Sequence, residues 1–166
     1  MRLFYEWGAR QVHKHGEELC GDDIAISRQT ESVTVALSDG LGSGVKANIL
    51  ATLTNQIAIR MLDDDLPLGE VVQTLSETLP VCAVRKVAYS TFAIAQFFTE
   101  GYARVVEFDS PHAIVLRQRK VHPVAYEERV MVGKTINETV LNLQEGDWVV
   151  FVSDGVINAG IGGAYP

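Results

Sequence analysis

Cysteine and long apolar runs are both scarce in this chain of 166 residues. Its two cysteines, Cys20 and Cys82, form no CxxC pair, so the sequence indicates neither a disulfide framework nor a zinc site built from cysteines. No stretch approaches the roughly 18 consecutive apolar residues of a membrane span, and the N-terminus, which contains Glu6 and Arg10, is unlike a signal peptide. We therefore expect a reduced, cytoplasmic protein without a membrane segment.

Positive charge is also in short supply. The chain has 14 basic and 21 acidic residues, a formal net charge of −7, and its basic residues are scattered. Nucleic-acid binding needs a clustered basic face, and the densest group here, Arg117, Arg119 and Lys120, is better explained by an exposed hairpin. We expect no nucleic-acid partner, although a bound metal ion would let an acidic protein act on a phosphate.

The order of the periodic segments predicts an α+β fold in a single domain, residues 1–166. Strands, then two helices, then many strands favour antiparallel sheets over an alternating parallel fold. A strand at 121–125 is expected to return beside 114–117, and strands at 138–143 and 147–152 are expected to form a hairpin. The other predicted strands lie at 3–12, 23–26, 32–38, 89–98 and 102–108.

Helical spacing of apolar residues predicts a long amphipathic helix over 45–62, with Ser43 as its N-cap. A second helix is expected over 68–79, closed by Pro80. The apolar positions that predict the first helix are Leu50, Leu53, Ile57 and Met61.

The tripeptide Ser-Asp-Gly follows two apolar runs of the chain, at 38–40 and at 153–155. Each run is short and rich in β-branched or aromatic residues, so each is expected to be a buried strand that the glycine ends. A carboxylate at the end of such a strand is held on a rigid element at the sheet edge. Asp39 and Asp154 occupy that position, which suits them to hold a divalent cation.

A third acidic residue, Asp22, lies where a loop enters a predicted strand. Alternation places Asp22 toward the same site and Asp23 on the opposite face. Two carboxylates about 4 Å apart repel by roughly 4 kcal/mol at an effective dielectric near 20, so such a cluster requires a proton or a cation between its members. Oxygen ligands suit Mg²⁺ or Mn²⁺. Taken singly, Asp39 and Asp154 would be ordinary Asp-Gly turns, but their joint occurrence favours a metal site.

Other candidate residues have simpler explanations. The Gly42–Gly44 stretch lacks the GxxxxGK[ST] and GxGxxG patterns, so its expected role is a tight turn that leaves the Gly40 carbonyl free to meet a cation. We expect the four scattered histidines to be satisfied side chains rather than ligands. His112, which follows a predicted turn at 110–111, could approach the acidic site. The other three are His13, His15 and His122.

Taken in order, these motifs resemble the metal-dependent protein phosphatase 2C family, and more narrowly its bacterial branch typified by stage II sporulation protein E (SpoIIE). The matching segments are 21–22, 38–44, 89–91 and 153–156, and the Asp-Gly-x-Gly-x-Gly element within the second is the most specific. The resemblance implies a β-sandwich of two antiparallel sheets flanked by helices, in α-β-β-α layers. It also implies hydrolysis of phosphoserine and phosphothreonine in phosphorylated protein substrates, by water that two Mn²⁺ or Mg²⁺ ions activate.

The resemblance also implies roles for individual residues. Asp39 resembles the carboxylate that both metals share, and the Gly40 carbonyl resembles a ligand of one of them. Asp22 resembles the residue that contacts the second metal, and Asp154 resembles a ligand of the other metal. The family closes its metal site with a further Asp, whereas no acidic residue follows Asp154 here, so we expect the domain to be truncated before its last metal-ligand motif. Arg10 is a candidate for a phosphate-binding arginine.

The expected function is a metal-dependent protein serine/threonine phosphatase. Two alternatives remain at this point. The absence of the last carboxylate favours a non-catalytic, phosphatase-like regulatory or binding module that keeps the fold without the metal centre. The second alternative is a phosphohydrolase that acts on a small molecule, such as a nucleotide, because the same metal centre would serve a protein or a small-molecule leaving group.

Overall fold

The computed structural model of the protein describes residues 2–13, 15–78 and 90–159, and its strands form two antiparallel sheets. The strands of the larger sheet, in spatial order, are β1 (Asp22–Arg28), β2 (Ser32–Gly40), β3 (Ser90–Phe98), β4 (Tyr102–Phe108), β8 (Lys134–Asn142) and β7 (Glu127–Met131). Those of the smaller sheet are β6 (Lys120–His122), β5 (Ile114–Arg117) and β9 (Trp148–Val150).

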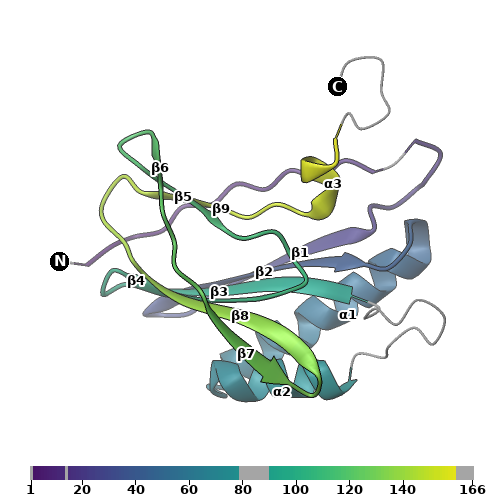
Figure 1. Cartoon of the computed structure of the whole chain (residues 1–166), viewed down its shortest axis with the longest axis horizontal. Helices are drawn as coiled ribbons and strands as arrows, with labels where there is room; N and C mark the ends of the chain where they lie inside the picture. The colour runs from purple at the N-terminus through teal and green to yellow at the C-terminus, as the bar shows by residue number, and fades with distance from the viewer. Residues whose placement is uncertain (1, 14, 79–89, 160–166) are drawn as a thin grey trace.

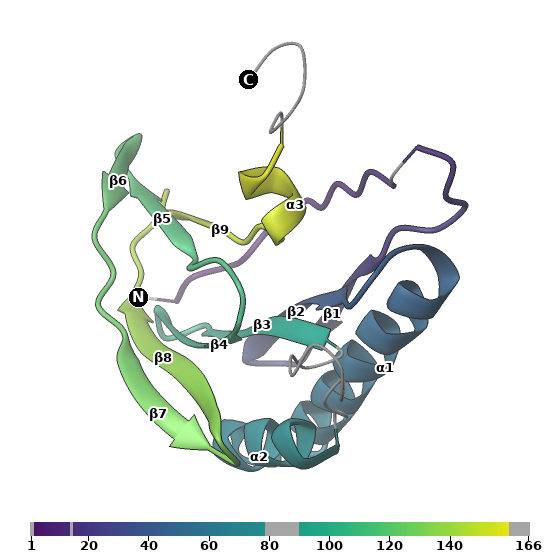
Figure 2. The same cartoon turned by 45° about the vertical axis from the view of Figure 1, so that its right-hand side comes forward.

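Two long helices, α1 (Gly44–Asp63) and α2 (Leu68–Thr78), cover the outer face of the six-stranded sheet (Figures 1 and 2). A short third helix, α3 (Asp154–Ile157), follows β9 on the side of the three-stranded sheet. The α+β class with antiparallel sheets is therefore confirmed, and the described residues form three of the four expected layers. No helix in the described ranges has the length and apolar content needed to cross a bilayer.

The strands of the larger sheet contribute alternate side chains to two separate cores. On β2, Ala36 belongs to the core beneath α1 and α2, whereas Val33 and Val35 pack in the core between the two sheets. Asp39 is an even number of residues from Val33 and Val35, so it shares their face. The end of β2 therefore presents Asp39 to the space between the sheets.

Helix α1 forms where the apolar spacing predicts it, but the face that it buries is different. Leu53, expected in the core, is 54% exposed, and small side chains at Ala47, Ala51 and Ala58 are fully buried instead. The reason is a close backbone approach, because a Cβ atom at Gly40 would collide with the carbonyl oxygen of Ala47. Only small side chains fit between this helix and the strand end.

The N-cap prediction is correct in position only. Ser43 precedes the first turn of α1 with extended backbone, but its hydroxyl makes no capping hydrogen bond. It donates to Oε1 of Glu17 at 2.7 Å instead, which ties the loop before β1 to the start of the helix. The second helix ends at Thr78 among the described residues, and the predicted stop at Pro80 lies outside them.

Two strand predictions are wrong. Residues 3–12 are extended but join no ladder, because their bonds to the sheet are isolated ones, such as Leu3 N to Thr99 O at 2.8 Å. The predicted hairpin between 138–143 and 147–152 does not form, since β8 pairs with β4 and β7 while β9 pairs with β5. Nη2 of Arg117 in β5 donates to Oδ2 of Asp147 at 2.7 Å. The turn between β8 and β9 is therefore where the chain passes from the larger sheet to the smaller one.

Strand β7 has no counterpart among the predictions. Its side chains are almost all exposed, so it lacks the apolar alternation that identifies a half-buried strand. Val132 and Gly133, both with positive φ, form the tight turn that joins it to β8. The predicted strand at 121–125 is shorter than expected, and β6 pairs with β5 as anticipated.

Candidate metal centre

Asp22 and Asp39 form a cross-strand pair at the ends of β1 and β2, where the register places them directly opposite each other. Behind them the backbone is closed by a hydrogen bond from Gly40 N to Gly21 O at 3.2 Å. Asp22 begins its strand, as predicted, and Asp39 is the last residue but one of its own. The two carboxylates therefore come from rigid neighbouring strands.

Asp154 approaches this pair from the other sheet. It does not end a strand as predicted, because β9 stops at Val150 and Asp154 is the first residue of α3. The preceding Ser153 donates its hydroxyl to Oδ2 of Asp22 at 2.6 Å. This bond joins two segments that are 131 residues apart in sequence and brings Asp154 to the acidic pair.

The three carboxylates meet at Asp39. The pKa of Asp39 is raised from the ordinary 3.8 to about 7, first by burial, then by the charge of Asp22 and by a hydrogen bond with Asp154. Without a cation, the cluster therefore tends to retain a proton near neutral pH. The convergence predicted for Asp22, Asp39 and Asp154 is present in the structure.

A buried asparagine of α1 fixes the strand pair from behind. Asn55 is fully buried; its amide donates to the Asp23 backbone oxygen at 2.8 Å and to the Asp23 carboxylate at 2.7 Å. Its own oxygen accepts from the Ser38 hydroxyl at 2.7 Å. Because Asp23 and Ser38 are also direct cross-strand partners, Asn55 clamps the pair next to Asp22 and Asp39. Asp23 thus faces α1, opposite to Asp22, as alternation predicts.

The donor set fits a hard divalent cation, since it consists of carboxylate oxygens and, at Gly40, a backbone carbonyl. Asp39 interacts with both Asp22 and Asp154. Over residues 2–13, 15–78 and 90–159, no three His, Cys, Asp or Glu side chains are placed to ligate one common ion.

Sequence reasoning missed two residues that build this site. Ser153 belongs to the repeated tripeptide but was assigned no contact, and its hydroxyl orients Asp22. Asn55 lies on the face of α1 that also contains the buried Ala51, Ala58 and Leu62, so an amide at this position of the helical repeat is the signal that could have identified it. Among the remaining candidates, Arg10 is exposed, although the neighbouring Gln11 donates to the Asp22 carbonyl at 3.0 Å. His13, His15 and His122 are exposed, and Cys82 lies outside the described residues.

The two-sheet architecture is that of phosphatase 2C domains. The phosphatase domain and regulatory fragment of the cell-fate determinant SpoIIE from Bacillus subtilis match 90% of this chain with a TM-score of 0.77 and 19% identity. RsbX, solved in complex with magnesium, matches 88% with a TM-score of 0.67 and 16% identity. The RsbU and RsbW domains of a Mycobacterium tuberculosis protein match 88% with a TM-score of 0.73 and 14% identity.

Residues 29–165 match the family described as Stage II sporulation protein E, and the chain belongs to this SpoIIE family. The match includes Asp39, Gly40 and Asp154 and begins after Asp22. The chain spans 44%, 72% and 42% of the lengths of the SpoIIE, RsbX and RsbU–RsbW chains, respectively. No curated protein sequence matches it.

Proposed function

We propose that this chain is a metal-dependent protein phosphatase domain that hydrolyses phosphoserine and phosphothreonine in a phosphorylated protein, in the cytoplasm, with Mn²⁺ or Mg²⁺. The observation that carries the proposal is the convergence of Asp22, Asp39 and Asp154 from β1, β2 and α3, which, together with burial as the larger cause, raises the pKa of Asp39 to about 7. Three acidic side chains placed this way need a cation to be ionised together. Membership of the SpoIIE family supports the same conclusion.

When bound, divalent ions would supply an activated water as nucleophile and positive charge for the phosphoryl oxygens. The residues that would hold them are Asp22, Asp39 and Asp154, with the Gly40 carbonyl as a further oxygen ligand. Asp39, in contact with both other carboxylates, is placed to be shared, and it would give up its proton when the site is loaded.

The surrounding residues orient these ligands. Ser153 fixes the Asp22 carboxylate by its 2.6 Å hydrogen bond. Asn55 keeps β1 and β2 in register behind the acidic pair, and Gly40 allows α1 to approach the strand end. Such partners of ligating carboxylates tune metal affinity because they limit how the ligands can turn.

A non-catalytic module is the second candidate, and a specific observation favours it. No three candidate ligands in the described residues are placed to bind one ion. In that case the fold would bind a partner without hydrolysing a phosphoester.

The test is phosphate release from a phosphoserine peptide and from a nucleotide, each with millimolar Mn²⁺ and with a chelator. We expect Mn²⁺-dependent release from the peptide, and a loss of about 10³-fold in Asp39→Asn, equivalent to about 4 kcal/mol of transition-state stabilisation. The matched control is Asp65→Asn, an exposed residue just beyond the opposite end of α1.

Equal and negligible release by the wild-type protein and Asp39→Asn would favour the non-catalytic module. Faster release from the nucleotide than from the peptide would favour a small-molecule phosphohydrolase. A rate in Asp65→Asn as low as that in Asp39→Asn would show that the loss reflects the change of charge and not the site.

A further inference from the structure

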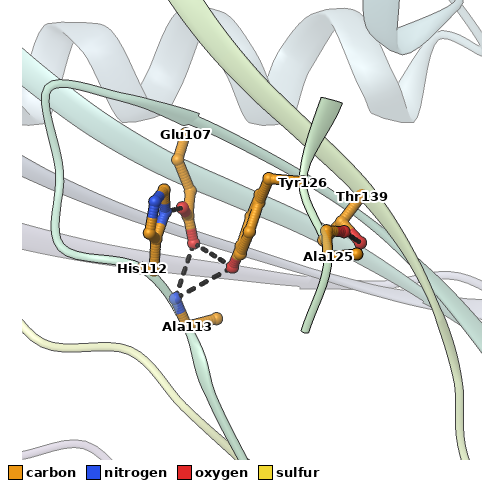
Figure 3. A network of polar contacts seen from close by, with 6 residues as sticks. All are labelled: Glu107, His112, Ala113, Ala125, Tyr126 and Thr139. Carbon is orange, nitrogen blue, oxygen red and sulfur yellow. Dashed lines mark hydrogen bonds and ion pairs between the residues drawn. The ribbon is translucent and has the colours of Figure 1, made fainter. Parts of the chain in front are cut away.

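A second buried carboxylate, Glu107 of β4, lies outside the metal centre and is surrounded by donors. Its side chain is fully buried, and its Oε1 accepts from the Ala113 backbone N–H at 2.7 Å and from the Tyr126 hydroxyl at 3.0 Å. Its Oε2 lies 2.6 Å from Nδ1 of His112. Figure 3 shows the His112 and Tyr126 side chains and the Ala113 backbone N–H meeting at this carboxylate.

The pairing of the strands places Glu107 on the same face as the acidic cluster. Asp39 pairs with Thr91 of β3, and Ala93, two residues further along that strand, pairs with Glu107. Cross-strand partners and residues two apart point to the same side of a sheet. Glu107 and Asp39 therefore both face the space between the sheets, two strands apart in the sheet and near the same end of it.

His112 lies at the end of the molecule where the acidic cluster is built. Two residues after it, β5 starts at Ile114, which pairs with Val150, the last residue of β9. The chain leaving β9 at that point reaches Ser153, which is bonded to Asp22. In Figure 1 the connection between β4 and β5 extends toward the end of the sheets where α3 lies.

The imidazole of His112 is held in one orientation from two sides. Its ring stacks on Tyr126 with 4.1 Å between centroids and 19° between planes, and Nδ1 bonds to Glu107. Tyr126 is itself anchored, because Thr139 of β8 donates to the carbonyl of the preceding Ala125 at 2.7 Å. Among the described residues Nε2 of His112 has no hydrogen-bond partner, and the side chain is 55% exposed.

This arrangement suits an anion more than any other ligand. A protonated imidazole would donate Nδ1–H to Glu107 and present Nε2–H outward, with its charge compensated by the buried carboxylate. Hydrogen bonds from a charged donor to a phosphate oxygen are about twice as strong as neutral ones. In a chain with a net charge of −7, a fixed cationic donor at the same end of the sheets as the acidic cluster is a specific aid to binding a phosphate.

We propose that His112, oriented by Glu107 and Tyr126, is a phosphate-binding residue that donates Nε2–H to the phosphoryl group of the substrate. This inference rests on the proposed phosphatase function. Glu107 and Tyr126 act through His112 and are positioning residues.

The test compares His112→Gln with His122→Gln, an exposed histidine on the hairpin of the smaller sheet. The first measurement is inhibition of phosphopeptide turnover by inorganic phosphate in Mn²⁺. We expect His112→Gln to weaken inhibition about 10-fold, as for loss of one charged hydrogen bond, and to raise the KM for the peptide similarly. His122→Gln is expected to stay within about twofold of the wild-type protein.

Tyr126→Phe separates binding from structure, because it keeps the stacked ring and removes the hydroxyl. We expect it to lower the thermal midpoint and to weaken inhibition by phosphate less than His112→Gln does, because the ring that stacks on His112 is kept. If His112 only completes the network around Glu107, His112→Gln would lower the midpoint in the same way and leave the inhibition constant unchanged, which would overturn the inference.

The second measurement does not depend on turnover. With Mg²⁺ present, inorganic phosphate is expected to shift the imidazole NMR signals of His112 and not those of His122. Absence of that shift overturns the inference even if the enzyme is active. If the wild-type protein releases no phosphate at all, the proposed function fails, and the NMR titration alone then decides whether His112 binds phosphate.

Discussion

Two sets of carboxylates face the space between the sheets, and they are stabilised in opposite ways. Glu107 is fully buried, yet a histidine, a tyrosine hydroxyl and a backbone N–H satisfy it. Asp39 is half-buried, and its nearest polar neighbours include two further carboxylates, Asp22 and Asp154. A carboxylate with its own donors is a structural element, whereas a carboxylate among carboxylates needs a proton or a cation. The comparison predicts that the two sites respond differently to substitution, metal and pH.

The largest effect on stability is expected at Glu107. Glu107→Ala removes the acceptor that the Tyr126 hydroxyl and the Ala113 N–H share and leaves them only their 3.1 Å contact with each other, and we expect a loss of about 3–5 kcal/mol in the free energy of unfolding. Urea unfolding without metal measures it, with the exposed Glu100→Ala as the control. A loss below about 1 kcal/mol would mean that water replaces these bonds. Glu107 would then not be a carboxylate stabilised by its own donors, and the contrast with Asp39 would not hold.

Metal is expected to stabilise the Asp39 site and not the Glu107 site. At a Mn²⁺ concentration 100 times its Kd, a ligand that binds only the native state adds about 2.7 kcal/mol to the stability. Asp39→Asn should abolish this gain, because it removes the carboxylate that contacts both others. Thermal unfolding with and without Mn²⁺ measures the gain. An unchanged wild-type midpoint, or an equal rise in Asp39→Asn, would contradict an intact cation site.

The sequence predicts the acidic site better than it predicts the sheet around it. Asp39 follows from a short apolar run that a glycine ends, and Asp22 from its place where a loop enters a predicted strand, so neither strand pairing nor helix packing has to be known to find them. Asp154 is found by the repeated tripeptide, although the chain there begins a helix instead of ending a strand. Repetition of a local motif carried this prediction.

What the sequence does not predict depends on distant partners. The hairpin expected for 138–143 and 147–152 does not form, because β9 pairs with β5 of the smaller sheet. The bond between Arg117 of β5 and Asp147 holds the start of β9 there. The polar edge strand β7 has no periodic signal. Asn55 stands among other polar residues of α1 and Glu107 between apolar residues of β4, and only the folded arrangement shows which donors and acceptors they meet.

A smaller effect is expected from the clamp behind the acidic pair. Asn55→Ala removes the bonds to Ser38 and Asp23, so we expect Mn²⁺ affinity to fall about 10-fold, in the range typical of residues that orient metal ligands. Ser27→Ala is the matched control, because Ser27 joins the same strand to the same helix through Asp63 at 2.7 Å, at the far end from the acids.

Both variants are expected to lose about 1–2 kcal/mol of stability, which urea unfolding without metal measures. Only Asn55→Ala should change the Mn²⁺ affinity measured by calorimetry. If the two variants have the same affinity as wild type, the clamp stabilises the fold and does not position the ligands.

The smallest effect is the pH dependence of the metal-free protein. The folded-state pKa of Asp39, about 7, lies above its ordinary value of 3.8, because of burial first and the charge of Asp22 second. Between these two values the native protein binds one proton more than the unfolded chain, so its stability falls as pH rises through this window and levels off above it. Asp147, whose pKa Arg117 lowers, acts oppositely and only as the pH falls below about 4.

Because solvent screens the half-buried Asp39, we expect a loss of about 1–2 kcal/mol between pH 5 and pH 8, well below the full value of such a shift. Asp39→Asn should flatten this slope and leave the metal-free protein more stable than wild type at pH 8, since the amide carries no charge at any pH. Saturating Mn²⁺ should also flatten it, because the cation favours the ionised carboxylate. Chemical unfolding at a series of pH values decides the matter. A slope that survives in Asp39→Asn would have to come from other groups, and the acidic cluster would then be as well satisfied as Glu107.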